Sequence, residues 1–163
     1  MKIEPMTAMD WESVRRIYQA GVDTGIATFE TQVPDSHILD QKFLPYCRLV
    51  ARQNDVVLGW SALTATSARF VYRGVNEVMI YVDPQARGQG VGKALLQALI
   101  TCSEAHQVWT LQAVILAQNQ ASINLHQACG FRVVGIRERI GFRDGIWHDT
   151  VLMERRSRIV EWE

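Results

Sequence analysis

The fold of this chain is decided by the stretch VMIYVDPQARGQGVGK, residues 78–93, which runs from a short apolar strand through a proline into a glycine-rich turn. Three glycines within five residues, Gly88, Gly90 and Gly92, let the main chain curve closely around a ligand. A helix that begins at this turn points its unpaired N–H groups and the positive end of its dipole into the curve. Because this arrangement binds phosphate and pyrophosphate groups, we expect the turn to hold a phosphorylated ligand.

Two common phosphate loops do not match this spacing. A Walker loop needs a glycine at position 87 and a hydroxyl residue at position 94, where this chain has Arg87 and Ala94. Without that hydroxyl there is no magnesium ligand, so hydrolysis of nucleoside triphosphates is not expected. A dinucleotide-binding fingerprint needs G-x-G-x-x-G, whereas Gly88, Gly90 and Gly92 are spaced as G-x-G-x-G. The pattern that does match is R-x-x-G-x-G, formed by Arg87, Gly90 and Gly92.

This pattern is similar to the pyrophosphate loop of the GNAT acyltransferases, which bind acetyl-CoA. A second segment supports the resemblance, because GNAT proteins carry a similar Asn, Ser and terminal Gly-Phe on the helix after the splayed strand. Here these residues are Asn119, Ser122 and Gly130-Phe131. The resemblance implies an α/β fold with a central, mostly antiparallel sheet, whose splayed middle strands admit the cofactor and whose faces are covered by helices.

Size and charge exclude several classes of protein. A length of 163 residues is typical of a single domain, here 1–163, in which residues 155–163 read as a basic C-terminal tail. A formal net charge of zero gives no broad basic field, so no nucleic-acid partner is expected. The chain has neither an apolar run long enough to span a membrane nor a signal-peptide core, so we expect no membrane association and a cytoplasmic location.

The three cysteines are odd in number and far apart in the sequence. Cys47, Cys102 and Cys129 form no C-x-x-C pair, so the sequence predicts no metal site. We expect all three to be reduced thiols, with Cys102 and Cys129 on the core faces of helices. A catalytic thiol is the less favoured alternative.

Hydrophobic periodicity predicts the elements around the glycine turn. Strands are expected at residues 2–4, 49–52, 56–64, 77–82, 110–116, 133–142 and 146–153. Helices are expected from 7 to about 20, from 35 to 43, after the glycine turn to about 102, and from 121 to 129. The order predicts an antiparallel first half, a strand–helix–strand–helix unit and a final hairpin.

Three further segments resemble a subgroup of the family, the phosphinothricin and methionine sulfoximine acetyltransferases. These segments are residues 28–31, 70–82 and 141–149, and the resemblance covers nearly the whole chain. It implies acetylation of the α-amine of a small, glutamate-like amino acid, with acetyl-CoA as co-substrate and no metal. It also implies a homodimer and a role in resistance to inhibitory analogues.

A catalytic base is needed because an amino acid is mostly an ammonium ion near neutral pH and has no lone pair to attack a thioester. Glu77 is the expected base, since it begins the strand that leads into the glycine turn and matches the family's catalytic Glu. His148 is the second candidate, as a base, proton relay or hydrogen-bond donor. Many GNAT enzymes place a general acid Tyr where this chain has His126, so the acid stays unassigned.

The substrate pocket is expected to include a cation and an aromatic wall. Arg73 can hold a carboxylate or phosphinate through two parallel hydrogen bonds. Phe29 and Glu30 are expected to form a wall of the pocket, where Glu30 attracts the substrate ammonium, and the resemblance adds Tyr72. The alternatives are that Arg73 is only exposed and that Phe29 is a buried loop anchor.

The expected acetyl-CoA site combines the splayed strand, the glycine turn and the next helix. Backbone N–H groups near Tyr81 and Val82 are expected to stabilise the oxyanion and, with Ile80, to bind the pantetheine amides. The complete set of expected cofactor-binding residues is Ile80, Tyr81, Val82, Arg87, Gly88, Gln89, Gly90, Val91, Gly92, Lys93, Asn119 and Ser122.

Two other functions compete with amino-acid acetylation. One is acetylation of protein or peptide amines, against which the shortness of the chain and the Arg73 clamp both argue. The other is a non-catalytic acyl-CoA sensor, which would need the cofactor loop but not Glu77.

Overall fold

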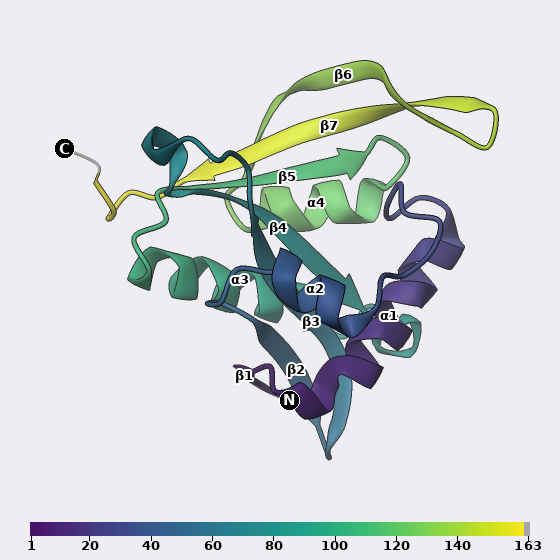
Figure 1. The fold of residues 1–163 in the computed structure, drawn as a ribbon, viewed down its shortest axis with the longest axis vertical. Coiled ribbons are helices and arrows are strands. Elements are labelled where there is room, and N and C mark those ends of the chain that lie inside the picture. Colours follow the sequence, from purple (N-terminus) through teal and green to yellow (C-terminus); the bar gives the residue numbers. More distant parts are fainter. Residues whose placement is uncertain (162–163) are drawn as a thin grey trace.

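The computed structural model describes residues 1–161, in which seven strands form one sheet in the order β1-β2-β3-β4-β5-β7-β6 (Figure 1). The strands are β1 Lys2–Pro5, β2 Leu49–Gln53, β3 Val56–Ala65, β4 Val75–Val82, β5 Thr110–Leu116, β6 Arg132–Arg143 and β7 Ile146–Arg156. The helices are α1 Trp11–Thr24, α2 Ser36–Lys42, α3 Val91–Ala105 and α4 Gln120–Ala128, with 3-10 turns η1 Ala8–Asp10, η2 Phe70–Tyr72 and η3 Pro84–Ala86. Within this described part of the chain, no helix is both long and apolar enough to cross a membrane.

The two middle strands separate after a short paired region. β4 and β5 run parallel and pair only as Val75 with Thr110, Asn76 with Leu111 and Glu77 with Gln112. Beyond Glu77, β4 stays paired with β3 as far as Val82 but loses β5 as a neighbour. Main-chain groups on that side of β4 are therefore left without ladder partners. The other neighbouring strands pair antiparallel, which confirms the expected mostly antiparallel sheet with splayed middle strands.

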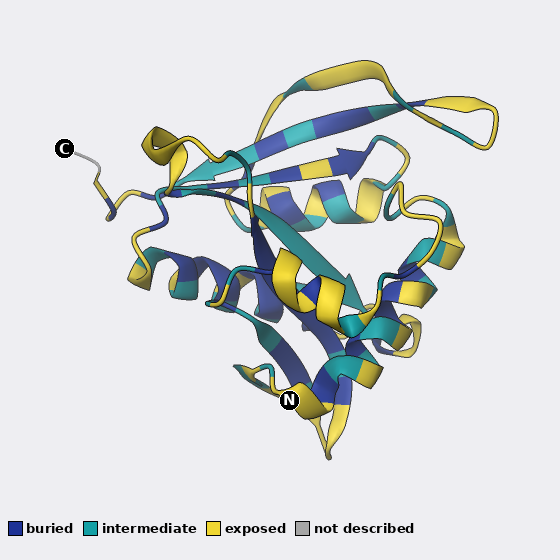
Figure 2. Cartoon of the chain, viewed as in Figure 1, coloured by how far each residue is buried: buried dark blue, intermediate teal, exposed yellow. Residues whose placement is uncertain are grey.

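Helices cover both faces of the sheet, and the buried residues lie between the layers (Figure 2). Neighbouring residues of β3 show the division, because adjacent side chains on a strand point to opposite faces. Ala62 packs with Ile17 of α1 and other residues of α1 and α2. Leu63 packs with Leu99 of α3 and Ile123 of α4. The glycine turn joins β4 of this sheet to α3, a helix with buried side chains in the same core as Leu63.

Helix α1 is longer than the sequence predicted. Its expected end near Ala20 is wrong, because the helix continues to Thr24 and ends at Gly25 with φ of 72°. Gly21 lies inside the helix, where an added Cβ would be 2.8 Å from the Tyr81 ring. The missing side chain lets α1 approach β4 closely, a contact between residues far apart in the sequence.

The cysteine expectation also needs correction. Cys47, in the loop between α2 and β2, is joined to Cys102 of α3 by a disulfide, so these two residues are not reduced thiols in this structure. Cys129 is free and partly buried at the end of α4. The pairing was not visible in the sequence because 55 positions separate the two residues.

The expected C-terminal tail begins later than its sequence suggested. Arg155 and Arg156 belong to β7, and Arg155 forms a 2.9 Å ion pair with Glu104 of α3. Ser157 and Val160 are buried. Residues 162–163 of the expected tail lie outside the described residues.

Candidate active site

A cavity of about 260 Å³ opens where β4 and β5 separate. Its walls come from both splayed strands, from the loop after α1, and from α4. Glu77, the expected base, and Phe29 and Glu30, the expected pocket wall, are among the residues that line it. The divergence of two strands therefore creates the space, and the side chains at the point of divergence face into it.

Glu77 lines this cavity from the last paired position of β4. Its Oε1 accepts a 2.9 Å hydrogen bond from Nε2 of Gln112, its ladder partner on β5. The bond holds one carboxylate oxygen in place, and a carboxylate has further lone pairs with which to accept a proton from a ligand. The arrangement suits a general base, and Gln112 was not among the residues expected from sequence.

His126 is a second proton acceptor on the same cavity, which sequence reasoning left without a role. Its ring is buried, and Nδ1 lies 2.7 Å from the main-chain oxygen of Ser122. A carbonyl oxygen only accepts, so Nδ1 carries the hydrogen and Nε2 offers a lone pair. Nε2 is buried without a hydrogen-bond partner among residues 1–161. Burial lowers the pKa of His126, although the bond to Ser122 opposes the shift.

His148 lies beside this cavity rather than on its wall. It is buried on β7, and its Nδ1 is 3.0 Å from Nε2 of Gln118. Its ring meets the edge of Phe29 at 5.8 Å between centroids. The structure thus brings His148 into contact with Phe29 of the pocket wall but does not place it on the cavity beside Glu77.

The loop that carries Phe29 and Glu30 is held by the final hairpin. The Arg143 guanidinium of β6 donates hydrogen bonds to the main-chain oxygens of Gly25 and Thr28. Phe29 lies directly over Gly141, where any added Cβ would overlap the ring. The pocket wall is therefore assembled from segments more than a hundred residues apart in sequence.

Tyr72 and Arg73 lie outside the cavity. Both are exposed at η2, and the Arg73 guanidinium packs over the rings of Phe70 and Trp109, 4.3 and 5.2 Å from their centroids. The described residues that line the cavity include a single Lys or Arg, which is Lys42 at the end of α2. The cation on the pocket wall is thus Lys42, which sequence patterns did not single out.

A second cavity of about 470 Å³ surrounds the glycine turn. Its lining includes all the expected cofactor residues except Gln89, whose side chain instead donates to the main-chain oxygen of Gln85. Ile80, Tyr81, Asn119 and Ser122 line both cavities, so the two spaces adjoin. A molecule lying in this channel can therefore extend toward Glu77.

The glycine turn has the conformation that its sequence predicted. Gly88 and Gly90 have φ of 74° and 79°, in the left-handed region that favours glycine. Gly90 caps α3, and the first helical hydrogen bond runs from the N–H of Ala94 to its oxygen. The N–H groups of residues 91–93 are therefore available at the positive end of the helix, with Arg87 and Lys93 beside them. These donors fit a diphosphate.

Comparison with known proteins identifies the fold. The model of the acetyltransferase (GNAT) family matches residues 11–131. This chain belongs to that family. The acetyltransferase is 39% identical over 155 residues to phosphinothricin N-acetyltransferase of Alcaligenes faecalis, covering 90% of this chain and 77% of that protein.

Two further similarities extend the comparison. L-methionine sulfoximine/L-methionine sulfone acetyltransferase of Salmonella typhimurium is 32% identical over 114 residues, 70% of this chain and 67% of that one. The crystal structure of a GNAT superfamily phosphinothricin acetyltransferase from Sinorhizobium meliloti, in complex with AcCoA, has a TM-score of 0.85 at 32% identity. That match covers 98% of this acetyltransferase and 95% of the solved chain. The resemblance stated from the sequence motifs is confirmed.

Proposed function

We propose that this acetyltransferase moves an acetyl group from acetyl-CoA to the α-amine of a small, glutamate-like amino acid of the phosphinothricin and methionine sulfoximine type. The observation that carries the proposal is the position of Glu77, a carboxylate at the point where β4 and β5 part, facing a cavity that adjoins the channel at the glycine turn. The names of the related proteins support the substrate class.

Glu77 acts first in the proposed reaction. The substrate amine arrives as an ammonium ion, and the Glu77 carboxylate accepts one proton, directly or through a water molecule. Bound acetyl-CoA supplies the thioester carbonyl that the free amine attacks. Gln112 holds the Glu77 carboxylate in position through its 2.9 Å bond to Oε1.

The amine loses a second proton when the amide is complete, and we assign this proton to His126. Its Nε2 has a free lone pair on the cavity side of α4. Because burial lowers its pKa, the ring is neutral near pH 7 and able to accept. His126 then returns its proton to the departing sulfur, and Glu77 releases its proton to solvent, so that both residues regain their starting protonation states.

Main-chain N–H groups of β4 supply the remaining stabilisation. Between Val78 and Val82 the side of β4 that faces the gap has lost its ladder partners. We propose that N–H groups near Tyr81 and Val82 donate to the carbonyl oxygen as it gains negative charge. The same stretch borders both cavities, which places it between the thioester and the amine.

Recognition of the amino acid uses two residues of opposite charge in the pocket lining. Glu30 attracts the ammonium group, and Phe29 closes one side of the cavity. Lys42 pairs with a carboxylate or phosphinate of the substrate, the role that the sequence-based expectation gave to Arg73. Since Arg73 is engaged with two aromatic rings outside the cavity, we propose Lys42 as the principal cation.

We also propose that the enzyme is a homodimer that works in the cytoplasm. β6 is an edge strand, and the hairpin exposes a set of apolar side chains that includes Ile136, Phe142, Ile146 and Trp147. An exposed apolar edge of this kind is typical of a protein interface. A second copy of the chain is the proposed occupant, and light scattering on the purified protein tests it.

A thiol-release assay over free amino acids and their phosphinate and sulfoximine analogues tests the proposed reaction. Release of free CoA that requires a glutamate-like amino acid is expected, with the acetylated product confirmed by mass spectrometry. A peptide acetylated faster than every free amino acid would replace this proposal with protein acetylation. Binding of acetyl-CoA without turnover across the panel would identify a sensor instead.

A further inference from the structure

We propose that Cys47 and Cys102 form a reversible thiol–disulfide site that responds to low-molecular-weight disulfides such as glutathione disulfide. The oxidised pair fixes the loop that supports β4 beside Glu77. The effect on turnover rests on the proposed function of Glu77, whereas formation of the disulfide does not. Disulfides in cytoplasmic proteins are usually transient and redox-sensing, which fits a site of this kind.

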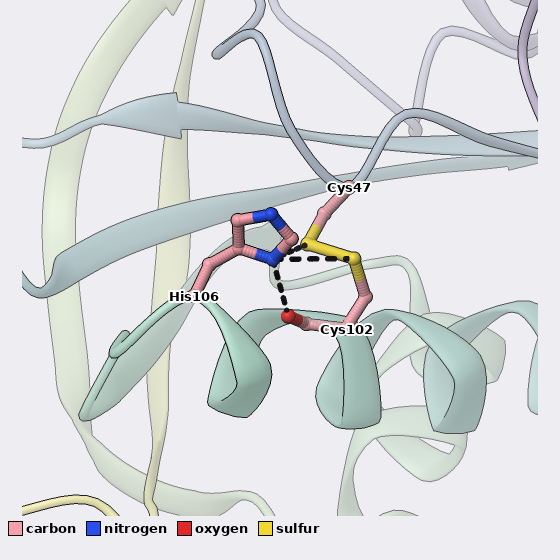
Figure 3. Close-up of side chains that lie close together, drawn as sticks. All are labelled: Cys47, Cys102 and His106. Atoms are coloured by element: carbon pink, nitrogen blue, oxygen red, sulfur yellow. Dashed lines mark hydrogen bonds between the residues drawn. A yellow bond between two sulfur atoms is a disulfide. The ribbon is translucent and has the colours of Figure 1, made fainter.

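The two cysteines are placed for bond formation by separate elements. Cys47 is buried in the loop before β2, and Cys102 is partly exposed near the end of α3 (Figure 3). Their Cα atoms are 5.6 Å apart, within the range in which a disulfide forms without movement of the main chain. Because Cys102 is the more exposed of the two, a dissolved disulfide reaches it first. We therefore assign the first attack to Cys102 and the second to Cys47.

His106 completes the cluster, one helical turn after Cys102. Its Nδ1 lies 2.9 Å from the main-chain oxygen of Cys102, and 3.7 and 3.8 Å from the sulfurs of Cys47 and Cys102. Because a carbonyl oxygen only accepts, Nδ1 carries a hydrogen in its contact with Cys102, and the same nitrogen lies near both sulfurs. This N–H stabilises a thiolate on either cysteine. The two sulfurs are bonded to each other in this structure, which favours redox chemistry over a metal centre at these three residues.

A short series of contacts links this pair to the proposed base. Tyr46, next to Cys47, stacks on the His106 ring with centroids 4.8 Å apart and planes 10° apart. The Tyr46 hydroxyl donates a 3.1 Å hydrogen bond to Oδ1 of Asn76. Asn76 is buried and directly precedes Glu77 in the short region where β4 and β5 pair. The disulfide therefore holds Tyr46 in the position from which it supports β4 at the catalytic end.

The chemistry is two successive thiol–disulfide exchanges. The Cys102 thiolate attacks one sulfur of glutathione disulfide, forms a mixed disulfide and releases one glutathione thiol. The Cys47 thiolate then attacks the Cys102 sulfur and releases the second glutathione. The two cysteines lose two protons and two electrons, and one glutathione disulfide becomes two thiols. An excess of reduced glutathione reverses both steps.

The site is tested on the full-length protein equilibrated in buffers with different ratios of reduced to oxidised glutathione. Free thiols are counted by alkylation under denaturing conditions and mass spectrometry. We expect three alkylated cysteines under reducing conditions and one, Cys129, under oxidising conditions. The oxidised form should unfold at a higher temperature, by roughly 5–15 °C. Alkylation of all three cysteines at every ratio would overturn the proposal.

Single cysteine variants separate the pair from the remaining thiol. Cys102→Ser and Cys47→Ser should each abolish the redox dependence of the unfolding temperature. Cys129→Ser is the matched control and should keep it, because burial raises the pKa of the Cys129 thiol and no disulfide involves it. Stoichiometric zinc in the reduced protein that is lost in Cys102→Ser would identify a metal site and overturn the redox assignment.

Tyr46→Phe tests the connection to Glu77, because it removes only the hydroxyl that bonds Asn76. Reduction of the unmodified protein should lower kcat roughly threefold or more while KM for acetyl-CoA stays constant. In Tyr46→Phe the disulfide should still form, but its reduction should leave kcat unchanged. A redox effect on kcat of equal size in this variant would refute the connection. If no amine is acetylated, the thiol count and unfolding temperature still decide whether the pair exists.

Discussion

Gln112 and Glu77 form the last pair of the β4–β5 ladder, and the Gln112 amide donates a 2.9 Å hydrogen bond to the Glu77 carboxylate. Glu77 is thus both the last residue of β4 that pairs with β5 and a residue that lines the cavity. Glu77→Gln keeps the shape of the side chain but removes the proton acceptor. We expect kcat to fall roughly 10²- to 10⁴-fold, measured by thiol release at neutral pH. Full turnover by this variant would show that the base lies elsewhere.

Gln112→Leu should lower kcat by less than Glu77→Gln, because it leaves the carboxylate in place but removes the donor that holds it. A loss of roughly 3- to 10-fold corresponds to one ordinary hydrogen bond. Calorimetry of acetyl-CoA binding serves as the control and should give an unchanged Kd. An equal loss in both variants would mean that Gln112 itself contacts the substrate.

Lys42→Met and Arg73→Met compare the two cations considered for the substrate anion. Lys42 lines the cavity, whereas Arg73 packs over two aromatic rings outside it. We expect Lys42→Met to raise KM for the amino acid roughly tenfold through loss of a charged hydrogen bond. Arg73→Met should leave KM unchanged. The reverse result would restore the sequence-based expectation for Arg73.

The lowered pKa of His126 has a measurable effect on stability. Its pKa is below the ordinary 6.5 in the folded chain because the ring is buried. The unfolded chain therefore binds more protons as the pH falls below 6.5, and unfolding becomes easier until folded His126 is also protonated. The free energy of unfolding should decrease by up to about 1.4 kcal/mol per pH unit in this window.

Denaturant titrations at several pH values measure this slope. His126→Phe, which keeps a ring but cannot titrate, should flatten it. His37→Asn, a change at an exposed position, is the control and should give the same dependence of unfolding free energy on pH as the unmodified protein. A slope that survives in His126→Phe would assign the effect to another group.

Gly90→Ala tests the glycine turn. Its φ of 79° is costly for alanine, by about 1–2 kcal/mol, and relief of this backbone strain changes the turn, although an added Cβ would meet no atom within 4 Å. We expect a lower unfolding temperature and a weaker Kd for acetyl-CoA by calorimetry. Gly135→Ala is the matched control, since its φ is not positive and an added Cβ has no atom within 4 Å. Equal Kd values for both variants would contradict a role of this turn in binding.

Local signals predicted most of the fold. The strand at Thr110–Leu116 agrees with its sequence-based bounds, and the turn at Asp144-Gly145 has positive φ at both residues. These features depend on residues close in the chain: alternating apolar positions, and residue types that tolerate a left-handed backbone. The family motifs likewise lie within short segments, which is why the glycine turn could be identified from the sequence alone.

Features that depend on distant contacts could not be predicted. Helix α1 continues through Gly21, where the Tyr81 ring leaves no room for a side chain, and Cys47 meets Cys102 only in the folded chain. The Arg73 guanidinium packs over Trp109, and the positively charged residue that lines the cavity is Lys42. Such pairings are set by tertiary packing, which leaves no periodic trace in the sequence.

Arg143 has one consequence for specificity. Its guanidinium grips the loop that carries Phe29 from the same hairpin that presents the exposed apolar side chains Phe142 and Trp147. A partner that docks on the hairpin and moves it is therefore expected to shift the Phe29 loop through Arg143 and through the contact between Phe29 and Gly141. If the proposed dimer forms through this hairpin, the preference among amines should change between dilute and concentrated enzyme.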